Sequence, residues 1–346
     1  SGLDSIESNL SLWLDASNID MLSNSSLSDG DAISTWKDLS GNGNNGQQSV
    51  TNEQPLFDSD GLNGMAGLDL DGTNDSFKLK TGAIINSSYT MFFVAQYELK
   101  DTSSVMFSQY DSSTSGRMNI QLFEPSDDTA ELWSWAGTGY KVSDVVSSNT
   151  PFIYTTKNNN RVVDGWAYGG TKSDTGTISI TADAPDVDNY IGKQTLSSNQ
   201  YFQPFKGVIS EIVIFDTALT DDQIIKIQYY LSKKWGLEST VDSDGDGYSD
   251  AIELLAGSSP IDSVDDPSVS FSDVVDENIG IESGLGSIES NLTLWLDAKN
   301  IDLANNSSLA NGDAVTQWID LSGNGNDGTQ TASVDQPIYR SSENEV

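Results

Sequence analysis

The segment Phe205-Lys-Gly-Val-Ile-Ser-Glu-Ile-Val-Ile-Phe215 decides the fold, because its last four residues are continuously apolar. A strand with apolar side chains on both faces must be covered on both sides. Residues 91–94, Met-Phe-Phe-Val, have the same character, whereas residues 118–122 alternate apolar and polar side chains as in a half-exposed strand. Clusters of Gly, Asn, Asp and Ser separate such segments throughout the first 237 residues. This pattern predicts an antiparallel β-sandwich.

A single helix is predicted directly after this segment. Thr220-Asp-Asp-Gln223 is a capping box, and Leu219 and Ile224 have the spacing of a hydrophobic staple. Gly236 can end the helix in the left-handed conformation that glycine adopts without strain. The buried stripe of this helix is predicted to consist of Ile224, Ile227, Leu231 and Trp235.

The chain contains an internal repeat. Residues 1–60 align without a gap on residues 283–342 at an offset of 282, and 37 of the 60 pairs are identical. We therefore predict a sandwich domain over residues 1–237, an acidic connector over 238–282, and a partial second sandwich over 283–346. The partial copy lacks the sheets on which its strands should pack. We expect another chain, or another copy of the repeat, to cover it.

Composition excludes several classes of function. The chain has 52 acidic and 16 basic residues, a formal charge of −36, which opposes binding to nucleic acid or to anionic membrane surfaces. No histidine or cysteine is present, which excludes a Ser-His-Asp triad and typical zinc sites. No apolar run approaches the ~18 residues of a membrane-spanning helix. We predict a secreted or cell-surface protein without membrane insertion.

The connector contains a cation-binding motif, Asp242-Ser-Asp-Gly-Asp-Gly-Tyr-Ser-Asp-Ala-Ile-Glu253. Side-chain oxygens stand at loop positions 1, 3, 5, 9 and 12, a backbone carbonyl at position 7 and glycine at position 6, as in loops that bind Ca²⁺. A solvated acidic linker is the alternative, since residues 238–282 hold no lysine or arginine. The metal ligands predicted from this spacing are Asp242, Asp244, Asp246, Tyr248, Asp250 and Glu253.

Two further groups of residues fit either a metal site or a simple turn. Asp69, Asp71, Asn74 and Asp75 could form a second calcium site at a loop tip, but Asp-Gly-Thr-Asn-Asp is also a common hairpin turn. Asp38 with Gly41-Asn-Gly-Asn44 has the same ambiguity, and the internal copy repeats it.

Two parts of the chain, the acidic motif and the first domain, resemble known families. Residues 242–260, including the trailing Gly-Ser-Ser-Pro, resemble thrombospondin type 3 and EF-hand-like calcium repeats of bacterial surface proteins. Leu-Trp-Leu-Asp-Ala16, Trp36-Lys-Asp-Leu-Ser-Gly-Asn-Gly-Asn44 and the segment at 205–215 with its helix resemble the laminin G-like, concanavalin A-like jelly-roll superfamily. This resemblance implies an all-β jelly roll with a C-terminal helix. Such domains bind carbohydrates or proteins, and some relatives are glycoside hydrolases.

The resemblance leaves three functions open. The paired carboxylates of the hydrolases, Glu-x-Asp-x-Glu, occur nowhere, so we expect no enzyme. The first hypothesis is a calcium-dependent adhesive or ligand-binding module of an extracellular tandem-repeat protein, and the second is a filament subunit with jelly rolls as spacers. The aromatic residues that could stack on a sugar, or instead fill the core, are Trp133, Trp135, Trp166 and Tyr168.

Overall fold

The structure is a computed structural model of the 346-residue chain, and it divides into two units, residues 1–267 and 268–346. Each unit is described by itself. In the first unit the structure describes residues 9–80, 88–98, 104–111, 116–126, 129–136, 145–160, 162–169, 174–177, 188–195 and 201–265. In the second it describes residues 293–296, 298, 300–302, 306, 308–321 and 325–340.

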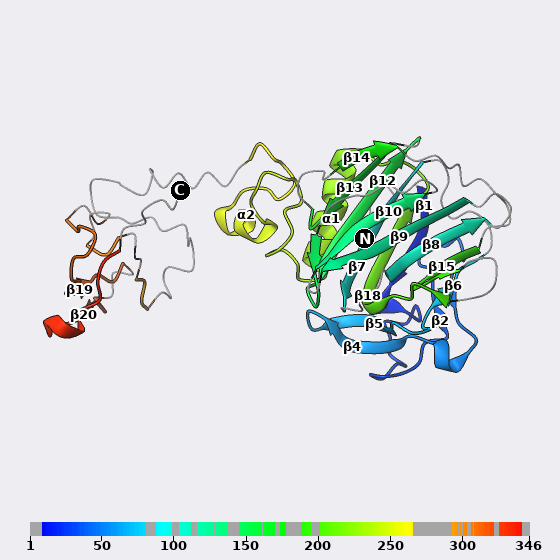
Figure 1. The fold of residues 1–346 in the computed structure, drawn as a ribbon, viewed down its shortest axis with the longest axis horizontal. Helices are drawn as coiled ribbons and strands as arrows, with labels where there is room; N and C mark the ends of the chain where they lie inside the picture. The colour runs from blue at the N-terminus through cyan, green and yellow to red at the C-terminus, as the bar shows by residue number, and fades with distance from the viewer. Residues whose placement is uncertain are drawn as a thin grey trace. The chain divides into compact units, whose positions relative to one another are not determined.

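The first unit is built from two antiparallel sheets that enclose one apolar core (Figure 1). The order of the first sheet is β14 (Asp174–Thr177), β13 (Val162–Ala167), β12 (Phe152–Asn159), β7 (Ser88–Tyr97), β18 (Lys206–Phe215), β5 (Met65–Asp71) and β4 (Leu56–Leu62), with β1 (Leu10–Asp15) also paired to β18. The order of the second is β11 (Val145–Ser147), β10 (Thr129–Ala136), β9 (Gly116–Ser126), β8 (Ser104–Asp111), β15 (Asp188–Ile191), β6 (Phe77–Lys78), β3 (Gly46–Gln47) and β2 (Thr35–Trp36). A small hairpin, β16 (Gln194–Thr195) with β17 (Tyr201–Phe202), and two 3-10 turns, η2 (Ala16–Asn18) and η3 (Thr51–Glu53), complete the sandwich. The predicted fold class, an all-β sandwich of two antiparallel sheets followed by a C-terminal helix, is confirmed.

The central strands are those that the sequence marks as apolar on both faces. Every residue of β18 after Lys206 is buried, and so are most residues of β7. The two strands pair in register Ile212 with Phe93, and β1 pairs with the same part of β18. β18 therefore joins the two ends of the domain sequence in one sheet.

The predicted helix is α1 (Asp221–Lys234), and its signals are confirmed. The capping box of Thr220 and Gln223 is formed, and Gly236 follows the helix at φ +62°. All four predicted stripe residues are buried, because the helix lies on the first sheet. Gln228 Nε2 also donates to Thr155 Oγ1 of β12 at 3.1 Å.

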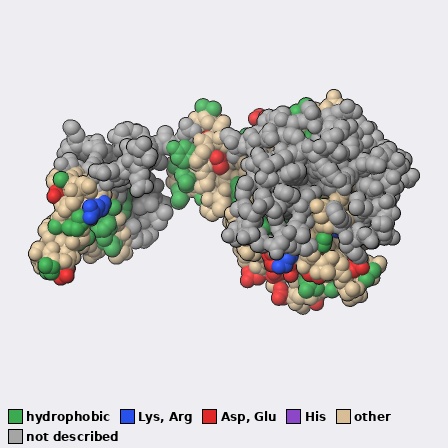
Figure 2. Space-filling view, viewed as in Figure 1, with side chains coloured by type: hydrophobic (Ala, Val, Ile, Leu, Met, Phe, Trp, Pro, Cys, Tyr) green, Lys and Arg blue, Asp and Glu red, His purple; other side chains and the backbone are tan. Residues whose placement is uncertain are grey.

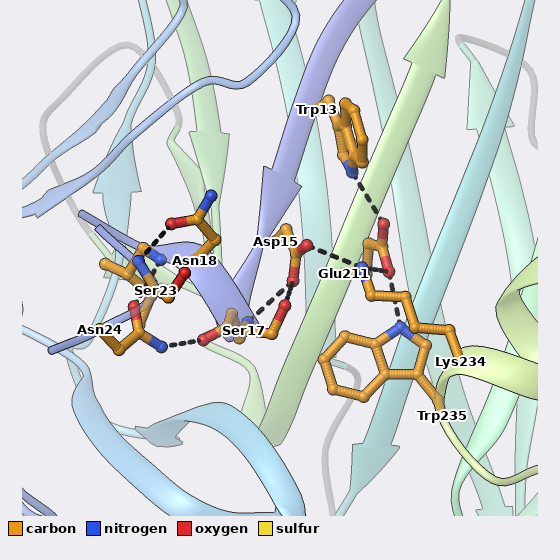
Figure 3. Close-up of polar contacts among 11 residues, drawn as sticks. Trp13, Asp15, Ser17, Asn18, Ser23, Asn24, Glu211, Lys234 and Trp235 are labelled. Atoms are coloured by element: carbon orange, nitrogen blue, oxygen red, sulfur yellow. Dashed lines mark hydrogen bonds and ion pairs between the residues drawn. The ribbon is translucent and has the colours of Figure 1, made fainter. Parts of the chain in front are cut away.

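A buried charge network attaches the end of α1 to the sheet (Figure 3). Glu211, in the middle of β18, is fully buried and accepts from Trp13 Nε1 at 2.7 Å and from Trp235 Nε1 at 2.6 Å. The Lys234 ammonium lies 2.7 Å from both Glu211 and Asp15. Burial alone would lower the pKa of Lys234, but the two carboxylates outweigh burial and raise it. Every oxygen of Glu211 therefore has a donor.

The second unit reproduces local contacts of the first 60 residues. Trp295 N donates to Asp320 Oδ1 at 2.9 Å, as Trp13 N does to Asp38 Oδ1 at 3.0 Å. The described elements here are β19 (Gln317–Trp318), β20 (Gly328–Thr329) and η5 (Ser333–Asp335). Residues 293–296, the counterpart of part of β1, are described but are not assigned to a strand. The local contacts of this segment thus form in both copies, whereas the pairing of β1 with β18 is described only in the first unit.

Acidic side chains gather at one edge of the first unit. In the view of Figure 2, Asp and Glu side chains gather along the edge formed by β4 and β5. None of the described helices is both long and apolar enough to cross a membrane.

Candidate functional site

The acidic motif is docked on the sandwich. Leu237 and Val241 are buried in the core, and Asp242 N donates to Tyr168 O at 3.0 Å, just beyond the end of β13. A second helix, α2 (Asp250–Ala256), follows the loop. Two of its first backbone N–H groups donate to carbonyls of Glu238 and Val241, which satisfies donors that a helix start leaves free. These contacts fix the loop between the end of α1 and the end of β13.

Three aspartates of the loop come together. Asp242, Asp244 and Asp246 each offer one carboxylate oxygen, and these atoms lie within 4.8 Å of one another. No other group of three acidic residues in the described part of the chain converges in this way. None of the ion pairs between described residues involves the three, so their negative charges face one another without a basic partner. The triad could bind a metal ion.

Backbone donors hold the loop around these carboxylates. Asp242 accepts from Gly245 N at 2.7 Å and from Gly247 N at 3.0 Å, and Asp246 accepts from Tyr248 N at 2.8 Å. Gly247 has a backbone φ of +101°, a value that residues other than glycine rarely adopt. The glycine at loop position 6 therefore meets the backbone requirement that the motif predicts.

Several buried carboxylate oxygens in the loop lack any hydrogen-bond partner. They are Asp244 Oδ2, Asp246 Oδ2 and both oxygens of Glu253, a residue that is itself fully buried. Burial raises the pKa of Glu253 to about 8, and the charges of Asp244 and Asp246 add to that shift. Burial, followed by the charge of Asp246, likewise raises the pKa of Asp244 to about 6. Because a buried, unpaired carboxylate is costly, these oxygens fit a cation between them.

The structure places the remaining predicted ligands differently. Asp250 is fully buried, and its carboxylate accepts from Ser243 N at 2.8 Å, from Ser243 Oγ at 2.9 Å and from Ser232 Oγ of α1. The side chain of Tyr248 is 41% exposed, which leaves its backbone carbonyl as the predicted ligand. The motif gave no sign of Ser232, because it lies on another helix, 18 residues before Asp250.

Among the other predicted polar groups, Asp38, Asp71 and Asp75 accept hydrogen bonds from backbone N–H groups. Asp71 Oδ1 accepts from the backbone N–H groups of Thr73 and Asn74, and Asp75 Oδ2 accepts from Asp71 N at 3.0 Å. Asp69 lies in β5 and has a raised pKa, through burial first and then the charge of Glu98. Asp38 likewise accepts from the backbone of Trp13, Ser40 and Asn44.

The candidate stacking aromatics have separate environments. Trp133 and Trp135 lie in β10, and their side chains are outside the described part of the structure. Trp166 is 6% exposed and belongs to the core, with the Lys157 ammonium 5.4 Å from its ring centre. Tyr168 follows β13 at φ +59° and is partly buried against the core.

A cavity of about 480 Å³ lies beside the residues that connect α1 to the acidic loop. The described residues that line it carry no charged side chain, although the chain as a whole is strongly acidic. Asn63 Nδ2 donates to the carbonyls of Trp235 and Gly236 and so fixes one wall. The lining residues are Asn63, Thr150, Pro151, Gly236, Leu237, Ser239 and Thr240.

Comparison with known proteins gave matches among solved structures only. No protein-family model and no curated protein sequence matches the chain. Domain 4 of an extracellular arabinanase from Geobacillus stearothermophilus, in complex with arabinotriose, matches with TM-score 0.46 and 18% identity over 62% of this chain and 96% of that domain. The CBM40 module of a Ruminococcus gnavus IT-sialidase, bound to α2,3-sialyllactose, matches with TM-score 0.38 and 13% identity over 47% and 95%. A pentraxin of Limulus polyphemus matches with TM-score 0.34 and 15% identity over 39% and 66%.

Proposed function

We propose that the first unit is a calcium-dependent, non-catalytic ligand-binding module of an extracellular tandem-repeat protein, with an adhesive role. The observation that carries this proposal is the fully buried Glu253, both of whose carboxylate oxygens lack a partner beside Asp242, Asp244 and Asp246. A folded protein without an ion would have to bury these oxygens unpaired. A divalent cation supplies the partner that the protein itself does not.

The donor set favours Ca²⁺ over other metals. All predicted ligand atoms are oxygens, and the chain has no histidine or cysteine to bind zinc or copper. Ca²⁺ takes six to eight oxygens at flexible geometry, whereas Mg²⁺ demands a smaller octahedral shell and retains water. Asp242, Asp244 and Asp246, the Tyr248 carbonyl and a bidentate Glu253 would together approach the calcium coordination number.

Calcium binding is tested by calorimetric titration of chelator-treated protein with CaCl₂ and, separately, with MgCl₂. We expect one site per chain with preference for Ca²⁺. Glu253→Gln should lose this binding, because one charge and one bidentate ligand are removed. Glu238→Gln is the matched control, since it removes a carboxylate of the same segment outside the loop. Equal calcium affinity of Glu253→Gln and the unchanged chain would contradict the proposal.

The uncharged cavity beside the loop supports a neutral ligand such as a carbohydrate. Its volume lies within the range of small-molecule sites, and hydroxyl and amide groups line it. A glycan array with and without calcium tests this role, with Ser239→Trp as the variant that should fill the cavity. We expect calcium-dependent binding that this variant abolishes. No glycan or protein ligand under either condition would refute the adhesive role.

The alternative is a filament subunit in which copies of the repeat exchange strands. Leu294 and Leu296 are 48% and 36% exposed, whereas their first-copy counterparts in β1, Leu12 and Leu14, are fully buried. Exposed apolar residues in a segment that is a strand in the first copy favour pairing with another chain. Leu294→Asp should then abolish self-association in sedimentation velocity, while Val334→Asp, at a site already 90% exposed, should not. A monomeric unchanged chain at all concentrations would refute the filament role.

A further inference from the structure

Asp250 stands at a loop position where the motif predicts a metal ligand, yet its carboxylate is already occupied. Oδ1 accepts from Ser243 N at 2.8 Å, and Oδ2 accepts from Ser243 Oγ at 2.9 Å and from Ser232 Oγ. All three residues are at least 99% buried. Hydrogen bonds to a charged acceptor are stronger than neutral ones, so these contacts hold the carboxylate firmly.

The two serines connect different parts of the molecule. Ser243 lies between the triad members Asp242 and Asp244, and therefore belongs to the loop that would surround the ion. Ser232 lies on α1, one turn from the residues that attach this helix to β18 through Glu211. Ser232 Oγ also lies 3.2 Å from the Tyr229 carbonyl, but the Asp250 carboxylate is nearer and charged. Asp250 thus links the loop to the sandwich through two hydroxyl groups.

We propose that Asp250, Ser232 and Ser243 form a latch that positions the loop for calcium, and that Asp250 acts through these serines as a positioning residue. The inference rests on the proposed calcium binding. Its consequence is that the sandwich is part of the metal site. The ion binds tightly only while the loop is docked on α1, and a bound ion in turn favours that docking.

The alternative assignment makes a different prediction for the same residues. If Asp250 bound the ion directly, its loss would weaken binding whether or not Ser232 were present. If it acts through the latch, removing Ser232 and altering Asp250 disturb the same arrangement. Their effects on affinity should then be far from additive, which a double-mutant cycle measures.

The test is the calcium affinity of the full chain carrying Ser232→Ala, Asp250→Asn or both, by calorimetry. Ser232→Ala is expected to weaken binding about tenfold, as loss of a group that orients a ligand commonly does. The calcium affinity of the double variant should lie within about threefold of the affinity of the weaker-binding single variant. Ser49→Ala is the control and should bind as the unchanged chain does, because Ser49 is exposed and lies outside the loop, α1 and the cavity lining.

The measured affinities of these variants decide between the assignments. Unchanged affinity of Ser232→Ala, or effects that multiply in the double variant, would overturn the latch. Non-additive losses support it. Should Ser232→Ala fail to fold by circular dichroism, Ser243→Ala replaces it in the same cycle, since it removes only the hydroxyl at 2.9 Å from Asp250. Absence of calcium binding by the unchanged chain would instead refute the proposed function itself.

Discussion

Calcium binding should release about one proton from the protein at pH 7. In the ion-free chain, burial raises the pKa of Glu253 to about 8 and that of Asp244 to about 6. At pH 7 these values leave Glu253 about nine-tenths protonated and Asp244 about one-tenth protonated. Because calcium binds the ionised carboxylates, both fractions must dissociate when the ion enters. The same sum gives about 1.5 protons at pH 6 and about 0.1 at pH 9.

The assay is calorimetric titration at each pH in two buffers of different ionisation enthalpy. The difference in observed binding enthalpy, divided by the difference in buffer enthalpy, gives the number of protons released. Glu253→Gln is the control if any residual binding is measurable, and its release at pH 7 should fall to about 0.1. A release near zero at pH 7 in the unchanged chain would refute the reasoning, because Glu253 would then be ionised before the ion arrives.

The same shift fixes the sign of the pH effect on stability. The pKa of Glu253 rises from its ordinary value of 4.5 to about 8 on folding, so the native ion-free chain holds a proton that the unfolded chain releases. The stabilisation is present below about pH 4.5 and is lost as the pH rises to about 8. Urea unfolding should therefore show ion-free protein weakening across this window. Saturating calcium should remove that loss.

Three further perturbations follow from the contacts around the loop and the helix. In Gly169→Ala, at φ +74°, the new Cβ would lie 2.2 Å from the Asp242 carbonyl oxygen, so calorimetry should show weaker calcium binding. Gly41→Ala is the control: at φ +85° in open space, it should lower the free energy of unfolding by about 1–2 kcal/mol and leave the calcium affinity unchanged. Lys234→Met should destabilise the protein by about 3–5 kcal/mol in urea unfolding, because it leaves the buried Glu211 carboxylate without its cationic partner. Adding Glu211→Gln should recover much of this loss. In small-angle scattering, a two-repeat protein should lengthen when calcium is added, and an unchanged profile would refute a stiffened joint.

Features encoded by neighbouring residues could be predicted from the sequence. The helix α1 was predictable because its cap, stripe and terminating glycine all lie within 17 residues. The acidic triad was predictable because a calcium loop gathers its ligands from one short segment. The pairing of β1 with β18 was not, since residues as distant as Leu10 and Phe215 meet only through the topology. Spacing identifies such segments but not their partners.

The interior charges show a second limit. Glu211 precedes the four apolar residues at the end of β18, which signals a buried partner, but nothing in the sequence indicates that Lys234, Trp13 and Trp235 are that partner set. Asp250 is the counterpart in the loop, where the motif suggested a ligand and the structure shows a contact with a distant serine. In both cases the carboxylate accepts hydrogen bonds from residues of another secondary-structure element, and a motif read from neighbouring residues cannot identify those donors.

The docking of the loop changes what calcium can do at the joint between the repeats. A flexible connector would gain order along its whole length when the ion binds. Here residues 238–253 are already fixed to the first sandwich by Val241, by the backbone pairing of Asp242 with Tyr168 and by Asp250. The ion would therefore strengthen an attachment to the first unit and set the direction in which the chain leaves it. Stiffening between two repeats would then require contacts in addition to those that fix the loop to the first unit.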